Sequence, residues 1–135
     1  MGAWGIGSFE NDDAADFIVE FEDGGVVTAA EAIRTVTEYE AEDYLEIMEA
    51  GVALAAAELV LAALSGDASR LTDEARAALA PHVSALARAD LRGDAVQAVV
   101  RILADSELRE LWEETDECDA WLANVEALLE RLNAL

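Results

Sequence analysis

The longest weakly charged run of the chain is AGVALAAAELVLAALS, residues 50–65. Its only charged residue is Glu58, and Gly66 directly after it is typical of the position that follows a helix. At the helical period, Val60, Leu61 and Leu64 fall on a different side from the other apolar residues, so other helices must cover this one all round. The run is too short to span a bilayer, which needs about 20 apolar residues. It therefore predicts a buried central helix.

The central helix is expected to begin near residue 41 and to end at 65. Its first half is amphipathic, with carboxylates on one side and Leu45 and Met48 on the other. Before it, a helix starts near Asn11 or Asp12, either of which can cap free amides, and ends before Gly24. A capping box, Thr28 with Glu31, predicts a further helix over 29–39.

Later in the chain, capping residues again precede apolar residues at helical spacing. We expect helices over 73–80 after Thr72, after Asp94, after Ser106, and over 118–133. Only Val26 and Val27 favour a strand, which is too little for a sheet. The sequence therefore predicts an all-α, single compact helical bundle of about five to seven helices. We expect residues 1–135 to form one domain, with an irregular glycine-rich N-terminal segment.

The charge balance is strongly acidic. Thirty Asp and Glu stand against eight Arg and no Lys, for a formal net charge of −22. Such a charge opposes binding to nucleic acid and to anionic membranes, because proteins that bind them attract the phosphates with Lys and Arg. It suits steering toward a basic partner, cation binding or imitation of a phosphate backbone. The 54% hydrophobic content excludes a disordered acidic tail.

The cellular location is predicted from the cysteine count and the first residues. Cys118 is the single cysteine, which excludes an internal disulfide and favours a reducing compartment. The opening MGAWGIGSFEND lacks the basic and apolar regions of a signal peptide, and Ile6 stands where a myristoylation motif has Ser or Thr. We expect a cytoplasmic protein with no membrane contact.

The strongest enzymatic pattern is Glu42, Glu46 and Glu49, spaced i, i+4, i+7 on the expected helix 41–65. These carboxylates could bind a hard cation such as Mg²⁺ or Mn²⁺ in a metal-dependent small-molecule hydrolase. A di-iron site is excluded because the single histidine, His82, has no Glu three residues before it. A solvated acidic face explains the same spacing, so we expect no catalytic residue, no cofactor and no specific metal site.

Glu58 is the unusual charge, because its position lies within the apolar arc of the central helix. An unpaired charge there costs several kcal/mol. The amides of Gly2, Gly5 and Gly7 and the Trp4 indole need acceptors, and Gly51 would leave room for their approach. We therefore predict a structural contact between a Glu58 oxygen and residues 2–8, with Trp4 in the core. The alternative is a general base in a pocket.

The same glycines precede the first expected helix N-terminus, which in principle is an anion site. The carboxylates of Asp12, Asp13 and Asp16 in the first turn would repel a phosphate, so we interpret the glycines as close-packing residues.

The opening MGAWGIGSFENDDAADF, residues 1–17, resembles the bacterial domain-of-unknown-function family 4259. The run AAAELV ending at Val60, the segment DSEL at 105–108 and the closing helix 121–132 are also similar to that family. The resemblance covers nearly the whole chain and implies no activity, catalytic residue or cofactor.

With no catalytic constellation, the sequence favours a non-enzymatic interaction module that binds a basic partner protein. An immunity-like, antitoxin-like or DNA-mimicking regulator would have these properties. Tyr39, Trp112 and Trp121 are the candidate exposed aromatic contacts.

Overall fold

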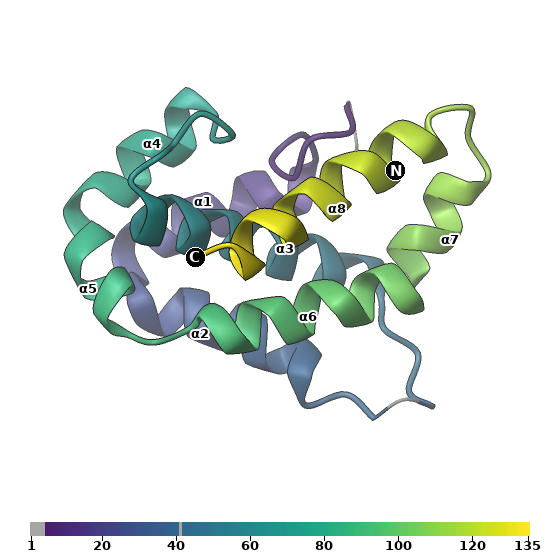
Figure 1. Cartoon of the computed structure of the whole chain (residues 1–135), viewed down its shortest axis with the longest axis horizontal. Coiled ribbons are helices and arrows are strands. Elements are labelled where there is room, and N and C mark those ends of the chain that lie inside the picture. The colour runs from purple at the N-terminus through teal and green to yellow at the C-terminus, as the bar shows by residue number, and fades with distance from the viewer. Residues whose placement is uncertain (1–4, 41) are drawn as a thin grey trace.

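The computed structural model describes residues 5–40 and 42–135, which form eight α-helices and a short 3₁₀ turn (Figure 1). The helices are α1 Asp12–Gly24, α2 Val26–Thr37, α3 Ile47–Ser65, α4 Asp73–Leu79, α5 Val83–Arg88, α6 Arg92–Ala104, α7 Glu107–Glu113 and α8 Cys118–Asn133, with the 3₁₀ turn at Ala80–His82. No strand occurs in these ranges, and the predicted all-α class is confirmed.

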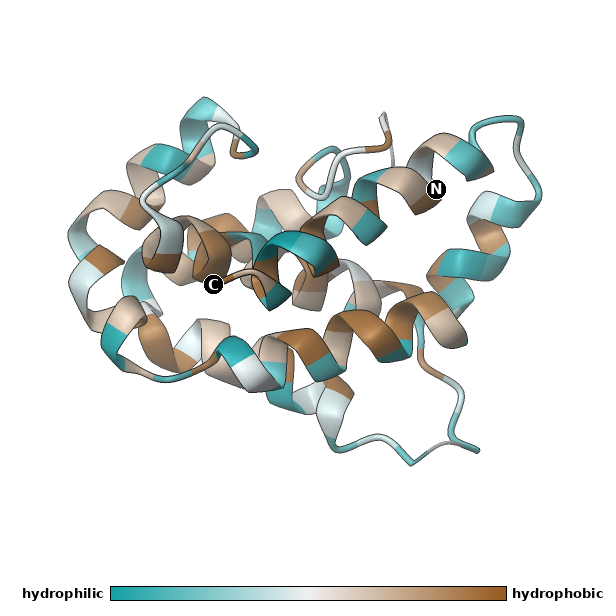
Figure 2. Cartoon of the chain, in the orientation of Figure 1, coloured by the Kyte–Doolittle hydropathy of each residue, from teal (hydrophilic) through white to brown (hydrophobic). Residues whose placement is uncertain are grey.

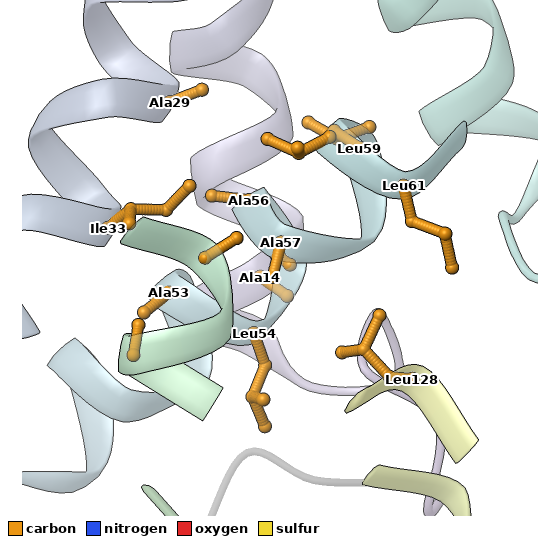
Figure 3. Packing of buried hydrophobic residues seen from close by; sticks show 14 of the residues in the cluster. Ala14, Ala29, Ile33, Ala53, Leu54, Ala56, Ala57, Leu59, Leu61 and Leu128 are labelled. Carbon is orange, nitrogen blue, oxygen red and sulfur yellow. The ribbon is translucent and has the colours of Figure 1, made fainter. Parts of the chain in front are cut away.

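Helix α3 lies at the centre and contacts every other α-helix. Thirteen of its nineteen residues are buried, Val60 completely and Leu64 in part. Its alanines allow close approach, and Figure 3 shows Ala56 and Ala57 among Ala14 of α1 and Ile33 of α2. Within the described ranges it is the one helix long and apolar enough to cross a membrane, but 72% of that window is buried inside the protein. The run 50–65 is therefore a core helix, as predicted.

The other helices turn their apolar faces toward α3. In Figure 2 hydrophilic residues gather on the outer turns and on the connections, such as that between α7 and α8. Local caps define several helix starts. The side chains of Asn11, Thr72 and Ser106 accept hydrogen bonds from backbone amides at the starts of α1, α4 and α7. Gly66 ends α3 in the left-handed region at φ 76°. These caps confirm the predicted boundaries.

The start of α3 differs from the prediction, because the helix begins at Ile47 and not near residue 41. Residues 42–46 form an irregular loop that is held by contacts from α6 and α7. Arg101 donates to the carbonyls of Glu40 and Asp43, and the Glu107 amide donates to the Leu45 carbonyl. The Glu107 carboxylate then accepts from the amide of Ile47 at 2.8 Å. Contacts from residues about sixty positions away thus set the helix start.

Two further boundaries were wrong. Gly25 has φ 56°, a positive-φ conformation that interrupts the helix between α1 and α2. Helix α2 therefore begins directly at Val26. Thr28 then lies inside the first turn and caps nothing in the predicted way. Helix α6 begins at Arg92, with Leu91 at the N-cap, so Asp94 lies inside the helix.

Candidate functional site

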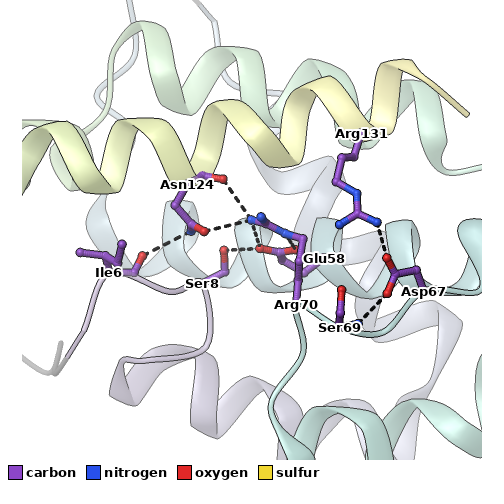
Figure 4. A network of polar contacts seen from close by, with 8 residues as sticks. All are labelled: Ile6, Ser8, Glu58, Asp67, Ser69, Arg70, Asn124 and Arg131. Atoms are coloured by element: carbon purple, nitrogen blue, oxygen red, sulfur yellow. Dashed lines mark hydrogen bonds and ion pairs between the residues drawn. The ribbon is translucent and has the colours of Figure 1, made fainter.

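Glu58 accepts three hydrogen bonds in the interior of the protein, where its side chain is 3% exposed (Figure 4). The Arg70 guanidinium donates from Nε to Oε1 at 2.8 Å and from Nη2 to Oε2 at 2.9 Å. The Ser8 hydroxyl donates to Oε2 at 2.7 Å. The buried carboxylate is thus paired with a charge and hydrogen-bonded at both oxygens.

Arg70 extends this network to a third part of the chain. It lies in the loop between α3 and α4, and its Nη2 also donates to the backbone carbonyl of Asn124 on α8 at 3.0 Å. The side-chain Nδ2 of Asn124 donates to the backbone carbonyl of Ile6 at 3.4 Å. The hydrogen bond with Glu58 raises the pKa of Arg70 above its ordinary value. The network joins α3, the 66–72 loop, α8 and the segment before α1.

The expected contact between Glu58 and residues 2–8 is present, but through a different donor. Ser8 provides it, whereas the Gly7 amide donates to Oε1 of Glu10 at 3.0 Å. Gly5 and Gly7 leave space for that carboxylate, because a Cβ on either glycine would come within 2.6 Å of a Glu10 oxygen. Gly2 and Trp4, the other expected partners, lie outside the described residues.

The two cap candidates, Asn11 and Asp12, lie at the start of α1, and Gly51 lies beside them. Asn11 caps α1 through its Oδ1, which accepts from the Ala14 amide at 2.8 Å, and Asp12 is the exposed first residue of the helix. A Cβ on Gly51 would lie 3.7 Å from the same Asn11 oxygen, an ordinary contact. Gly51 therefore faces the α1 cap, and the close approach does not require a glycine there.

Sequence reasoning missed Arg70, the main partner of Glu58. Arg70 shares no helix with Glu58, and only the fold of the loop brings it back across α3. The one available signal was chemical, since a buried carboxylate in an apolar helix needs a cation. The described residues leave no buried side-chain polar atom without a partner. Both Glu58 oxygens are therefore occupied by donors from the protein itself.

The acidic set that formed the alternative metal site is dispersed. Glu42 lies in the loop, Glu46 holds the extended N-cap position of α3, and Glu49 lies in the first helical turn, where its carboxylate accepts from the Tyr39 hydroxyl. The spacing of i, i+4, i+7 describes one face only if the helix begins near 41, and it does not. Across the ranges 5–40 and 42–135, no three His, Cys, Asp or Glu residues are placed to hold a metal ion.

The two tryptophans expected at the surface are buried instead. Trp112 and Trp121 are 6% and 2% exposed, and their rings stack with centroids 6.3 Å apart and planes 11° apart. Tyr39 is half-buried. The aromatic residues named from the sequence therefore do not form a contact surface.

Most arginines of the protein make contacts within the chain, whereas most of its carboxylates form no ion pair within the described ranges. Five arginines donate to backbone carbonyls of the chain itself: Arg70, Arg76, Arg92, Arg101 and Arg109. Ion pairs in the described structure involve only five of the thirty carboxylates. Three of these arginines, Arg70, Arg76 and Arg109, also pair with carboxylates, and the eight arginines in all leave a net charge of −22.

Comparison with known proteins identifies a family. A family profile described as "Domain of unknown function (DUF4259)" matches residues 2–124. No curated protein and no solved structure matches the chain.

Proposed function

This chain belongs to the DUF4259 family, and we propose that it is an acidic interaction module that binds a basic partner protein in the cytoplasm. Regulators of this kind would be immunity-like, antitoxin-like or DNA-mimicking proteins. One observation carries the proposal: thirty carboxylates share the chain with eight arginines, and only five of those carboxylates form ion pairs within the described structure.

Electrostatic complementarity would favour binding to such a partner. A surface with a net charge of −22 repels nucleic acid and anionic lipid, and it attracts a cationic protein over about a Debye length, roughly 10 Å at 0.1 M salt. Complementary fields of this kind accelerate association and exclude wrong partners. The module would therefore select its partner first by charge and then by shape.

The alternative hydrolase loses its structural basis, because helix α3 does not present Glu42, Glu46 and Glu49 on one face. Calorimetry with Mg²⁺ and Mn²⁺ separates the two functions. We expect only weak, salt-sensitive cation association with the acidic surface. Micromolar binding that disappears in Glu46→Ala would support the hydrolase and contradict the binding module.

Affinity capture from a lysate of the source organism tests the proposal directly. The tagged protein should retain a basic protein at about 50 mM salt and release it at about 500 mM, where the Debye length is much shorter. An unrelated acidic protein of similar net charge is the control bait, because it reports simple ion exchange. The captured protein, once purified, should bind this chain and not the control. A captured partner that is not basic, or binding unaffected by salt, would contradict the proposal.

A further inference from the structure

A groove runs between α1, α2 and the first turns of α3, and its floor is apolar. We call it the α1–α3 groove and define it by Phe17 and Val52 in its floor, Met48 at its mouth, and Asp16, Glu20 and Glu49 along its edges. Its volume is about 400 Å³, within the range of about 300–1,000 Å³ typical of ligand pockets.

The apolar part of the groove is accessible. The Phe17 ring is buried at the bottom, Val52 is half-buried, and Met48 is 55% exposed, one of the most exposed large apolar side chains of the described chain. Methionine is flexible and polarizable, and it is over-used on surfaces that adapt to partners. An apolar side chain from another protein could therefore cover Met48 and Val52.

The edges of the groove are acidic on both sides. Asp16 and Glu20 lie one turn apart on the exposed face of α1, and neither makes an ion pair within the described ranges. Glu49 stands on α3 across the groove, where the Tyr39 hydroxyl donates to it. No arginine from the described residues lines the groove. Its carboxylates are not grouped to hold a metal ion. They suit several cationic side chains spaced along the surface of a partner protein.

We propose that the α1–α3 groove receives the apolar face of a basic amphipathic helix of the partner protein. This inference rests on the proposed function and names its binding surface. A helix laid in a groove inserts apolar residues at i, i+3, i+4 and i+7. Lys or Arg residues beside that stripe would then meet Asp16 and Glu20 on one side and Glu49 on the other. A small inorganic cation would leave the apolar floor uncovered, and an uncharged helix would desolvate the carboxylates without compensation.

The probe for the test is a fluorescein-labelled synthetic peptide of about four helical turns, with leucines along one face and lysines beside them. The control peptide has the same composition in an order that removes the apolar face. Fluorescence anisotropy should give a dissociation constant at least about tenfold lower for the amphipathic peptide, a difference of about 1.4 kcal/mol.

Matched variants of the protein locate the binding surface. Met48→Lys adds a positive charge inside the groove, and Val100→Lys adds the same charge on α6 at a side chain of similar exposure, 48%. We expect Met48→Lys to weaken peptide binding about tenfold or more, Met48→Leu to preserve it, and Val100→Lys to change it less than about threefold. On the unaltered protein, amide chemical shifts should move mainly in residues 13–20 and 47–52 when the peptide is added.

The outcomes separate this inference from the proposed function. Equal weakening by both lysine variants, equal binding of both peptides, or shift changes centred on α7 and α8 would overturn the groove while leaving a charge-driven binding module in place. Absence of peptide binding would also overturn the groove. The proposed function is judged separately, by capture of the basic partner.

Discussion

Arg70 holds both carboxylate oxygens of Glu58, from a loop position twelve residues further along the chain. The pair links the 66–72 loop to the middle of α3. Ser8, in the segment before α1, donates to Glu58, and Asn124, on α8, accepts from Arg70. A buried ion pair is expensive to desolvate, and its measurable effect appears when one partner is removed. Glu58 therefore serves to position three segments on α3.

Removal of Arg70 should destabilise the protein strongly. Arg70→Met strands the Glu58 carboxylate in the core, and we expect the free energy of unfolding to fall by about 3 kcal/mol, the lower end for buried pairs, because Arg70 is partly exposed. The double variant Glu58→Leu/Arg70→Met should lose much less than the sum of the two single variants. Urea denaturation measures all four proteins. Additive losses would contradict the coupling.

The Ser8 hydroxyl should contribute less than Arg70. Ser8→Ala removes one hydrogen bond and leaves both guanidinium contacts of Glu58, so the expected loss is about 1 kcal/mol in the same denaturation experiment. Ser84→Ala on the exposed face of α5 is the control and should change stability by less than about 0.5 kcal/mol. A Ser8→Ala protein as stable as the control would show that the hydroxyl contact is not formed in solution.

Two glycines should respond to alanine in opposite directions. Gly51 lies inside α3 with ordinary space for a Cβ, so Gly51→Ala should stabilise the protein by about 0.5–1 kcal/mol through the higher helix propensity of alanine. Gly25 has φ 56°, and a Cβ there would lie 2.7 Å from Nδ1 of His82, so Gly25→Ala should lower the melting temperature. A destabilising Gly51→Ala would contradict ordinary van der Waals spacing between position 51 and the α1 cap.

Tyr44 should ionise only at strongly alkaline pH. Its hydroxyl donates to Glu110 at 2.9 Å, and this hydrogen bond is the main reason that its pKa rises to about 12, with Glu107 adding to the effect. Because the folded pKa lies above the ordinary value of 10.0, the contact is fully stabilising below about pH 10 and is lost as the pH rises toward about 12.

The absorbance of tyrosinate in a Tyr39→Phe protein measures this titration, since Tyr44 is then the only tyrosine. Adding Glu110→Ala should move the midpoint back toward 10.0. Circular dichroism must show that the fold persists over the same pH range. An identical midpoint with and without Glu110 would refute the assigned cause.

Features set by neighbouring residues could be predicted from the sequence, and features set by distant residues could not. The run 50–65 is apolar all round, so its central place follows from the pattern alone, and the caps at Asn11, Thr72 and Ser106 use amides within three residues. The start of α3 depends on Glu107, and the partner of Glu58 depends on how a loop folds back. Neither contact leaves a periodic signal.

The α1–α3 groove could not be predicted from the sequence either, because it also depends on contacts between distant residues. Met48 was expected on an apolar helix face, and nothing in its sequence neighbourhood indicates that its side chain would be left half open to solvent. Its exposure results from α3 starting at Ile47 and from the way that α1 and α2 pack against the first turns. Conversely, Trp112 and Trp121 are buried because α7 and α8 stack their rings together, a pairing that no local pattern specifies.

The excess of thirty carboxylates over eight arginines should set how the protein responds to ionic strength. In a fold held by carboxylate–guanidinium pairs, added electrolyte weakens attraction and repulsion together. Here only five of the thirty carboxylates form ion pairs within the described structure, so the main long-range term left for counterions to screen is the repulsion among carboxylates. Rising electrolyte should therefore tighten the isolated protein while it loosens the complex with a cationic partner, and the two states would have opposite ionic optima.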